Sequence, residues 1–334
     1  MSTSEHVAAA VTGSKLIRRT DERFKGPLAR FLVPKTFDHL LAIYKSPDEV
    51  QQRPALFGVM GRLVERAREC PVSQPAEPFL PYREEVLSLC TSNLTVPNTR
   101  QQALECLVQL IQLPGCLDGD ELVFALQSIT SLLVKLDDDN TEDISSVALE
   151  GLTTVAPLVP KRIDETVLPS LFGLLPDKAP SRQDQTSIDG YKLALACLAA
   201  LCFLPDLFEI LVIRILSRLE SVCNRASDDK IQYAQDALYA HHLLTTLRVV
   251  MEKKVTAKHA DIANHAARVI PRLYSLFLKP ALAQMDLKTV ASEPKLIEDT
   301  GRILMLLNQQ NDERYVLTQP SILAVKRAKG PISA

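Results

Sequence analysis

A five-residue phrase returns three times in this chain and constrains its fold more than any other feature. It reads ALECL at 103–107, ALEGL at 148–152 and ALACL at 194–198. In each copy, apolar residues stand at offsets 0, 1, 4, 7 and 8 from the first alanine. This spacing places the five side chains on one stripe of an α-helix. Each copy therefore predicts one amphipathic helix, which we call an A helix.

The copies are almost evenly spaced along the chain. The second begins 45 residues after the first (148 minus 103), the third 46 residues later (194 minus 148), and a weaker copy, ALYAH at 237–241, another 43 residues on. Between them lie helices of a second type, which we call B helices: VLPSLFGLL at 167–175, DLFEILVIRILSRLE at 206–220 and VIPRLYSLF at 269–277. Helix pairs with this period are typical of HEAT arrays. The sequence predicts an all-α, HEAT-type α-solenoid with a repeat of about 45 residues.

Composition supports helices and excludes several kinds of partner. Hydrophobic residues make up 46% of the 334 residues but aromatic residues only 5%, and apolar residues do not alternate with polar ones as in strands. The 38 basic and 40 acidic residues give a net charge of -2, which provides no field for nucleic acid. No apolar run approaches the roughly 18 residues of a membrane span. We therefore expect neither direct nucleic-acid binding nor membrane insertion.

The chain is expected to hold one repeat array with short ends. We predict a flexible lead-in at 1–26, the solenoid at 27–325 and a short basic tail at 326–334. Two connections are long: the proline-rich segment 70–81, expected to be an extended crossover, and the polar segment 176–190, expected to be a mobile loop. Predicted N-terminal caps pair Asn98 with Gln101, Asp118 with Glu121 and Asp206 with Glu209.

No combination of residues typical of an active site occurs. GVMGRL at 58–63 lacks the Lys-Ser/Thr ending of a phosphate-binding loop, and no nucleophile or zinc-protease motif is present. The seven cysteines lack metal-ligand spacing and fit a reducing cytosol or nucleus. Asp261 and His265 share a helix face and are a candidate metal pair, but Asp261 also suits an N-cap. We expect no enzyme activity, no cofactor and no metal site.

Clusters of charge are the remaining candidates for a binding surface. The partner-binding candidates are basic residues of two successive helices: Arg214, Arg218, Arg248, Lys253 and Lys254. The alternative is that they are solvated or stabilise the helix C-termini, where cations are favoured. An acidic run at 137–139, 142 and 143 is expected to be a solvated turn or a docking ridge.

Four segments carry a resemblance to a known family: LVPKTFDHLLAIYKSP (32–47), VLPSLFGLLPDKAP (167–180), LPDLFEILVIRILSRLE (204–220) and VIPRLYSLF (269–277). They resemble fungal members of the MMS/Met-type HEAT-repeat DNA-repair and transcription family, the adaptor of the cytosolic iron-sulfur assembly targeting complex. The resemblance covers most of 27–310 and looks like an interior or truncated stretch of a longer family member.

The resemblance implies a non-enzymatic adaptor in the nucleus and cytoplasm. Its implied partners are a WD-repeat protein and a small factor of the iron-sulfur assembly machinery. Its implied clients are iron-sulfur helicases and polymerases of DNA repair, including nucleotide excision repair, replication and transcription. The alternative is a karyopherin-like transport protein or another assembly scaffold, because such proteins use a similar solenoid.

Overall fold

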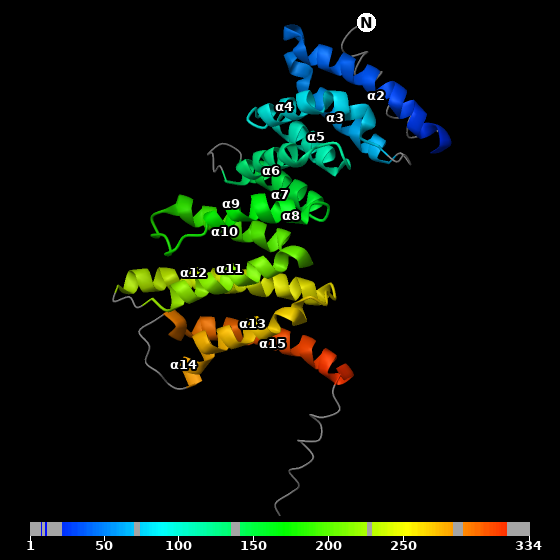
Figure 1. Cartoon of the computed structure of the whole chain (residues 1–334). Helices are drawn as coiled ribbons and strands as arrows, with labels where there is room; N and C mark the ends of the chain where they lie inside the picture. The colour runs from blue at the N-terminus through cyan, green and yellow to red at the C-terminus, as the bar shows by residue number, and fades with distance from the viewer. Residues whose placement is uncertain are drawn as a thin grey trace, which may run out of the picture. The chain divides into compact units, whose positions relative to one another are not determined.

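The structure is a computed structural model of the chain and describes residues 22–69, 74–134, 141–225, 229–282 and 290–318, together with Ala8 and Val11. Within these ranges every regular element is helical (Figure 1). The chain divides into two compact units, Met1–Leu171 and Phe172–Ala334. In each unit, helices pack mainly on others close to them in sequence. The predicted all-α solenoid is confirmed.

The first unit consists of helix pairs, preceded by a long helix. Its A helices are α3, α5 and α7, and α5 lies between the other two and contacts both. The elements are α2 (Glu22–Lys45), the 3₁₀-helix η1 (Pro47–Gln52), α3 (Arg53–Arg68), the 3₁₀-helix η2 (Glu77–Tyr82), α4 (Arg83–Asn93), α5 (Arg100–Gln112), α6 (Gly119–Val134), α7 (Thr141–Val155), α8 (Pro160–Arg162), the π-helical turn η3 (Ile163–Val167) and α9 (Leu168–Gly173), which crosses the division between the units.

The second unit continues with longer helices. Its A helices are α10 and α12, which contact each other, and α12 also packs on α11 and α15. The elements are α10 (Gln185–Leu201), α11 (Pro205–Cys223), α12 (Lys230–Thr256), α13 (Ile262–Leu273), the π-helical turn η4 (Tyr274–Leu278), α14 (Lys279–Leu282), the 3₁₀-helix η5 (Val290–Ser292) and α15 (Pro294–Thr318).

The repeated phrase forms the buried stripe of each A helix. All five stripe residues of α5 and all five of α10 are buried, and in α7 only Leu149 is half-buried. The stripe prediction is therefore confirmed for the three clear copies. The same offsets also fit α3 from Leu56 onward, a copy that was missed because it contains no ALxxL phrase. The buried stripe residues of α3 are Leu56, Phe57, Met60, Leu63 and Val64.

The weak fourth copy was placed in the wrong register. Leu238 of ALYAH is 50% exposed, whereas Tyr239 and Ala240 are buried. The buried side of α12 begins at Gln235 and Asp236, and the offsets of the stripe fit from Tyr239, which is 45 residues after Ala194 (239 minus 194). A tyrosine in place of the first alanine hid the register. The starts of α3, α5, α7, α10 and α12 at 53, 100, 141, 185 and 230 are unevenly spaced, and a 45-residue repeat stays a prediction.

Glycines allow successive A helices of the first unit to approach closely. A Cβ atom at Gly61 of α3 would lie 3.4 Å from the Cα of Cys106 in α5. A Cβ atom at Gly151 of α7 would lie 2.8 Å from Cγ2 of Val108, on the same helix α5. Real Cβ atoms do not occur at the second distance, so a larger residue at 151 would force the side chain of Val108 to move or the two helices to separate.

Two π-helical turns interrupt the B helices, each ending two residues before a proline. η3 ends at Val167, before Pro169, and η4 ends at Leu278, before Pro280. A proline ring clashes with the carbonyl four residues earlier, and here that carbonyl lies within the π turn. The wider i→i+5 turn moves the carbonyl away, so the helix continues through the proline. The spacing of apolar residues in the sequence did not predict these turns, because the turns contain no unusual type of residue.

Several expectations about connections were wrong. α2 begins at Glu22, so the last residues of the predicted flexible lead-in, 22–26, are helical. The proline-rich segment is not extended throughout, since residues 77–82 form η2. Phe79 of η2 is buried edge-to-face against Phe37 at 5.4 Å, and this contact holds the turn on α2. Most of the lead-in, the acidic positions 137–139 and the tail 326–334 lie outside the described residues.

The polar connection before α10 is anchored rather than free. Within 176–184 the backbone N–H of Ala179 donates to buried Asp236 of α12, at 3.0 Å. Asp184 then caps α10 by accepting from the N–H of Ser187 at 3.1 Å. The loop is therefore shorter than the predicted 176–190, because α10 begins at Gln185. The loop is also fixed to α12 rather than mobile.

The predicted caps had mixed outcomes. Asp118 and Glu121 form the expected reciprocal pair, each side chain accepting from the other's backbone N–H at 2.9 Å. The other two positions were wrong. Thr99 rather than Asn98 precedes α5, and Asp206 lies inside α11, behind Pro205. A proline at the first helical position sets the start of α11 without a side-chain cap.

The close approach of α5 and α7 predicts an unusual response to alanine. Gly151→Ala should lower the free energy of unfolding by about 1 kcal/mol, because overpacking of about 1–3 kcal/mol exceeds the gain in helix propensity. Gly58→Ala is the matched control within α3, where the nearest atom to the new Cβ, Nη1 of Arg62, is 3.7 Å away. It should stabilise by about 0.5–1 kcal/mol. Urea unfolding followed by circular dichroism measures both, and equal stabilisation by the two substitutions would contradict the close contact.

Candidate interaction surface

The five basic candidates lie in the second unit but do not form one patch. Arg214 is exposed on α11, whereas Arg218, one turn later, forms an ion pair with Asp177. Arg248 of α12 pairs with Glu252 of the same helix at 2.6 Å. Lys253 is exposed. Together with Lys254, which pairs with Asp261, three of the five charges are thus already neutralised locally.

Lys254 is not a surface residue, so its place among the docking candidates was wrong. Its side chain is 0% exposed and its Nζ lies 2.5 Å from Oδ2 of Asp261. The ammonium group also stands over the ring of Phe208, 4.7 Å from the centroid. A buried charge needs such partners, because its desolvation costs several kcal/mol. Sequence spacing placed Lys254 in a basic cluster, but it turns about 100° away from Lys253 on the helix.

The same ion pair bears on the candidate metal pair. Asp261 occupies the N-cap position of α13, but its side chain makes no cap hydrogen bond and accepts from Lys254 instead. The ring of His265 stands edge-on to Phe208 at 5.1 Å. Burial lowers the pKa of His265 below its ordinary value. Among the described residues, no group of three or more histidine, cysteine or acidic side chains is arranged to hold a metal ion.

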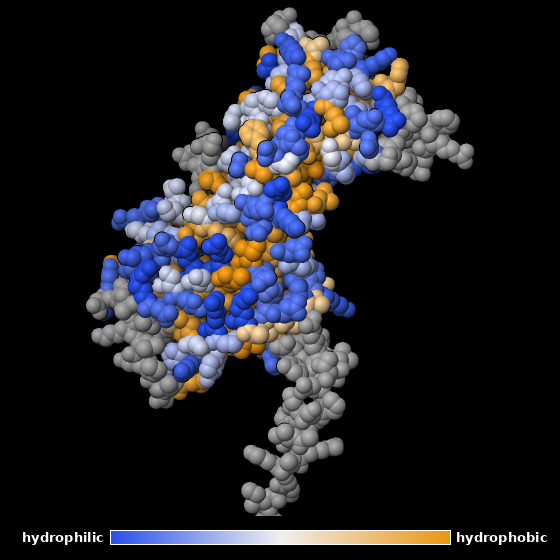
Figure 2. Space-filling model, in the orientation of Figure 1, coloured by the Kyte–Doolittle hydropathy of each residue, from blue (hydrophilic) through white to orange (hydrophobic). Residues whose placement is uncertain are grey.

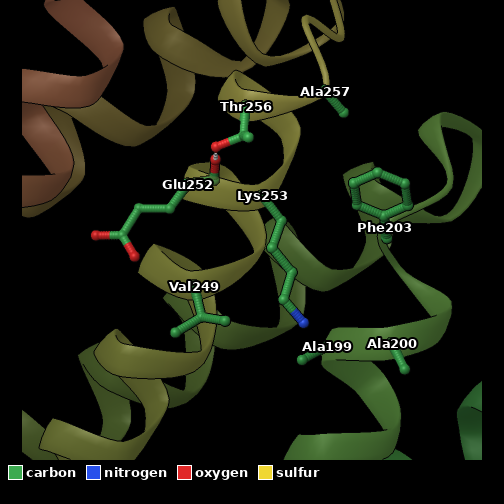
Figure 3. Close-up of a pocket in the computed structure, with 8 residues that line it drawn as sticks. All are labelled: Ala199, Ala200, Phe203, Val249, Glu252, Lys253, Thr256 and Ala257. Atoms are coloured by element: carbon green, nitrogen blue, oxygen red, sulfur yellow. Dashed lines mark hydrogen bonds between the residues drawn. The ribbon is translucent and has the colours of Figure 1, made fainter.

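A shallow groove lies between the end of α10 and the last turns of α12. Its volume is about 630 Å³, and it is open along one side. Small and apolar residues form most of it, with the charged side chains of Lys253 and Glu252 at its edge (Figure 3). The amino end of Lys253 points toward Ala199, while the carboxylate of Glu252 points away. The lining residues are Ala199, Ala200, Phe203, Val249, Glu252, Lys253, Thr256 and Ala257.

The groove is supported from below by the buried lysine. The ring of Phe203 packs at a tilt against the ring of His259, with the centroids 4.6 Å apart, and its centroid lies 5.8 Å from Nζ of Lys254. The backbone N–H groups of Lys258 and His259 close α12 by donating to the carbonyls of Val255 and Lys254, at 3.0 and 2.9 Å. This is the Schellman arrangement, and it puts Lys258 at a φ of 58°, where glycine is the usual residue. The end of α12 is thereby fixed beside the groove.

Two adjacent histidines connect α12 to the helices on either side. Nδ1 of His241 lies 2.5 Å from Oδ2 of Asp299 in α15. Nδ1 of His242 lies 3.0 Å from the hydroxyl of Tyr191 in α10. The role of the two histidines as links between helices was missed, since the partners are more than fifty residues away in the chain.

The described cysteines are buried thiols. Burial raises the pKa of Cys197 to about 11 and that of Cys116 and Cys223 to about 12. Metal binding and nucleophilic attack both need the thiolate. These cysteines therefore act as small apolar core residues at neutral pH.

Apolar side chains also reach the surface among the polar ones (Figure 2). In the second unit they are spread over α11, α12, the η4 turn, α14 and α15. Separate exposed residues of this kind are normal and do not by themselves mark a site. None of the helices in the described ranges has the length and hydropathy needed to span a membrane. The larger exposed hydrophobic residues of the second unit are Ile213, Ile231, Leu238, Tyr274, Leu282 and Met305.

Helix pairs stacked around glycine-lined and alanine-lined contacts, with a shallow surface groove, define a helical-repeat protein of the HEAT class. Residues 194–316 match the MMS19 C-terminal family, described as RNAPII transcription regulator C-terminal. Over this stretch the chain is similar to the C-terminal region of the MMS19 family. The matched residues include the groove and the link between His241 and Asp299, whereas Tyr191, the partner of His242, lies just before them.

Other comparisons add little. No curated protein matches the chain. Two engineered proteins of known crystal structure are similar at 14% identity. One has a TM-score of 0.38, over 89% of this chain and 77% of that one, and the other a TM-score of 0.31, over 90% and 97%. Scores of this size do not establish a common fold.

The buried ion pair gives the first test of this region. Asp261→Asn should lower the free energy of unfolding by about 3–5 kcal/mol, because it leaves the Lys254 ammonium buried without a carboxylate. Adding Lys254→Met should recover most of that loss. Lys253→Met is the matched control, and it should change stability by less than about 0.5 kcal/mol because Lys253 is exposed. Chemical denaturation measures all four proteins, and a double variant no more stable than Asp261→Asn would contradict the pairing.

The link from α10 to α12 through Tyr191 and His242 predicts that the free energy of unfolding depends on pH. Burial, followed by the nearby charges of His241, Lys192 and Lys295, lowers the pKa of His242 from its ordinary value of 6.5. The unfolded chain therefore binds a proton more readily at this site than the folded one, so stability is lost as pH falls below 6.5.

His242→Asn should reduce this loss. The difference in the free energy of unfolding between about pH 7.5 and about pH 5.5 should be smaller for the variant than for the natural chain. Denaturant titrations at both pH values measure it. An unchanged difference would show that His242 titrates normally in the folded protein.

Proposed function

We propose that this chain is a non-enzymatic scaffold that links iron-sulfur client proteins to the cytosolic iron-sulfur assembly machinery. The clients are proteins of DNA repair, replication and transcription, such as iron-sulfur helicases and polymerases. The assembly partners are a WD-repeat protein and a small assembly factor. The scaffold acts in both nucleus and cytoplasm, with a solenoid at 27–325 between short terminal segments.

The match of residues 194–316 to a transcription-regulator family carries this proposal. The family description points to transcription, and the resemblance of the four quoted segments extends it to iron-sulfur clients. The physical form of the chain agrees, because a stack of helix pairs offers a long surface that proteins can follow. The buried thiols favour a role in which clusters are handled by partners rather than ligated by this chain, since a protonated thiol is a poor ligand.

A pull-down with purified components tests the proposal. The full chain should retain the WD-repeat protein, the small assembly factor or an iron-sulfur helicase. The purified chain should carry no stoichiometric iron and hydrolyse no nucleotide. Iron that is present in an amount equal to that of the protein, and that is lost on substituting Cys197 or His265, would overturn the scaffold proposal in favour of a cluster carrier.

A second pull-down separates the scaffold from a karyopherin-like transport protein. The bait is a Ran-type GTPase loaded with GTP, and the matched control is the same protein loaded with GDP. We expect no retention in either state. Tight, GTP-dependent capture would support the transport alternative and contradict the adaptor.

A further inference from the structure

We propose that the groove between α10 and α12 binds an amphipathic helix of a partner protein, with acidic residues beside its apolar face. The inference deepens the proposed scaffold function by assigning a binding site and the chemistry of its occupant. It rests on the shape of the groove, its apolar walls and the charge at its edge.

The size and shape of the groove suit a short helix. Val249 and Ala257 mark its length along α12, and eight residues of helix (257 minus 249) span about 12 Å, or roughly two turns. The methyl side chains of Ala199 and Ala200 form the opposite wall, so they leave room for an entering backbone or a large side chain. Because the groove is open along one side, it would leave much of a small molecule in water, whereas enclosed pockets bury most of their ligand.

Apolar contacts supply the attraction at the base of the groove. Phe203 and Val249 are half-buried there and present carbon surface to the opening. Helices that bind in grooves insert residues at positions i, i+3, i+4 and i+7. Two turns of such a helix would cover Phe203 and Val249 and remove their remaining apolar surface from water.

The charge at the edge selects the occupant. Lys253 is exposed, its amino end points across the groove toward Ala199, and it forms no ion pair with any residue that the structure describes. The nearby Arg248 and Glu252 neutralise each other within α12. Lys253 is therefore the cation left to meet a ligand, and a carboxylate beside the apolar face of the incoming helix complements it.

The position of Lys253 does not depend on the buried pair beneath it. Lys254 faces the interior and is bound to Asp261, whereas Lys253 faces the groove, so consecutive lysines serve separate purposes. A change at Lys253 should alter binding without disturbing the core. This separation makes the site testable by charge reversal.

The test uses the full chain and a labelled model peptide. The peptide is helical, with leucine at i, i+3, i+4 and i+7 and glutamate along one side; a second peptide has lysine in place of each glutamate. Fluorescence anisotropy should show saturable binding of the acidic peptide and at least about tenfold weaker binding of the basic one. Equal affinity of the two peptides would overturn the proposal.

Two charge reversals on the same helix locate the site. Lys253→Glu should weaken binding of the acidic peptide about tenfold and strengthen binding of the basic peptide. Lys230→Glu is the matched control, because Lys230 is an exposed lysine at the opposite end of α12, 23 residues away (253 minus 230). It should leave both affinities within about twofold. A loss with Lys230→Glu as large as that with Lys253→Glu would place the binding elsewhere.

A single tryptophan gives an independent measurement. The chain contains no tryptophan, so Phe203→Trp places a unique fluorophore in the groove. Its emission should shift to shorter wavelength when the acidic peptide binds, and binding without a shift would contradict the assigned location.

Light scattering of the chain alone tests a different occupant of the groove, a second copy of the chain. Dimers that Lys253→Glu converts to monomers would favour self-association over the proposal.

The peptide experiments do not use the iron-sulfur assembly proteins. Loss of the peptide interaction in Lys253→Glu is therefore informative whether or not the pull-downs succeed. If the assembly partners fail to bind but the acidic peptide occupies the groove, the proposed role in iron-sulfur assembly is wrong and the helix-binding site remains supported. If the partners bind and the peptide does not, the groove assignment alone fails.

Discussion

Successive A helices of the first unit pack closely against one another at glycine residues. In the first unit the contacts are made by Gly61 against Cys106 and by Gly151 against Val108, and both partners belong to α5. Each A helix thus buries its stripe only because its neighbour lies near enough to cover it. A helix with a single apolar stripe gains little stability alone. The stack, rather than any one helix, is the stable unit.

The same principle explains the groove in the second unit. Ala199 and Ala200 are small residues at the end of α10, and a groove remains between them and the last turns of α12, with the amino end of Lys253 pointing toward Ala199. A small residue covered by a neighbour becomes a helix contact, and one left uncovered becomes part of a binding surface. The buried Lys254, paired with Asp261 and placed over Phe208, supports that surface from inside.

Electrostatics in this protein is decided residue by residue. A net charge of -2 says little about binding, because Lys253, Lys254 and Arg248 have three different situations within two turns of one helix. One is exposed, one is buried with a carboxylate and one is neutralised by a neighbour on the same helix. A scaffold can therefore present a local cationic site without a basic surface overall. A carboxylate-bearing helix is the kind of partner that such a site selects.

The sequence by itself determined the helical class, the stripes of α5, α7 and α10, and the absence of a recognisable catalytic motif. These follow from local periodicity, which is independent of what lies across the contact. The tertiary structure alone decided the register of α12, where Tyr239 replaces an alanine, and the π turns before Pro169 and Pro280. It also decided the burial of Lys254 and the groove beside Lys253, because burial depends on neighbours that the chain brings together from distant positions.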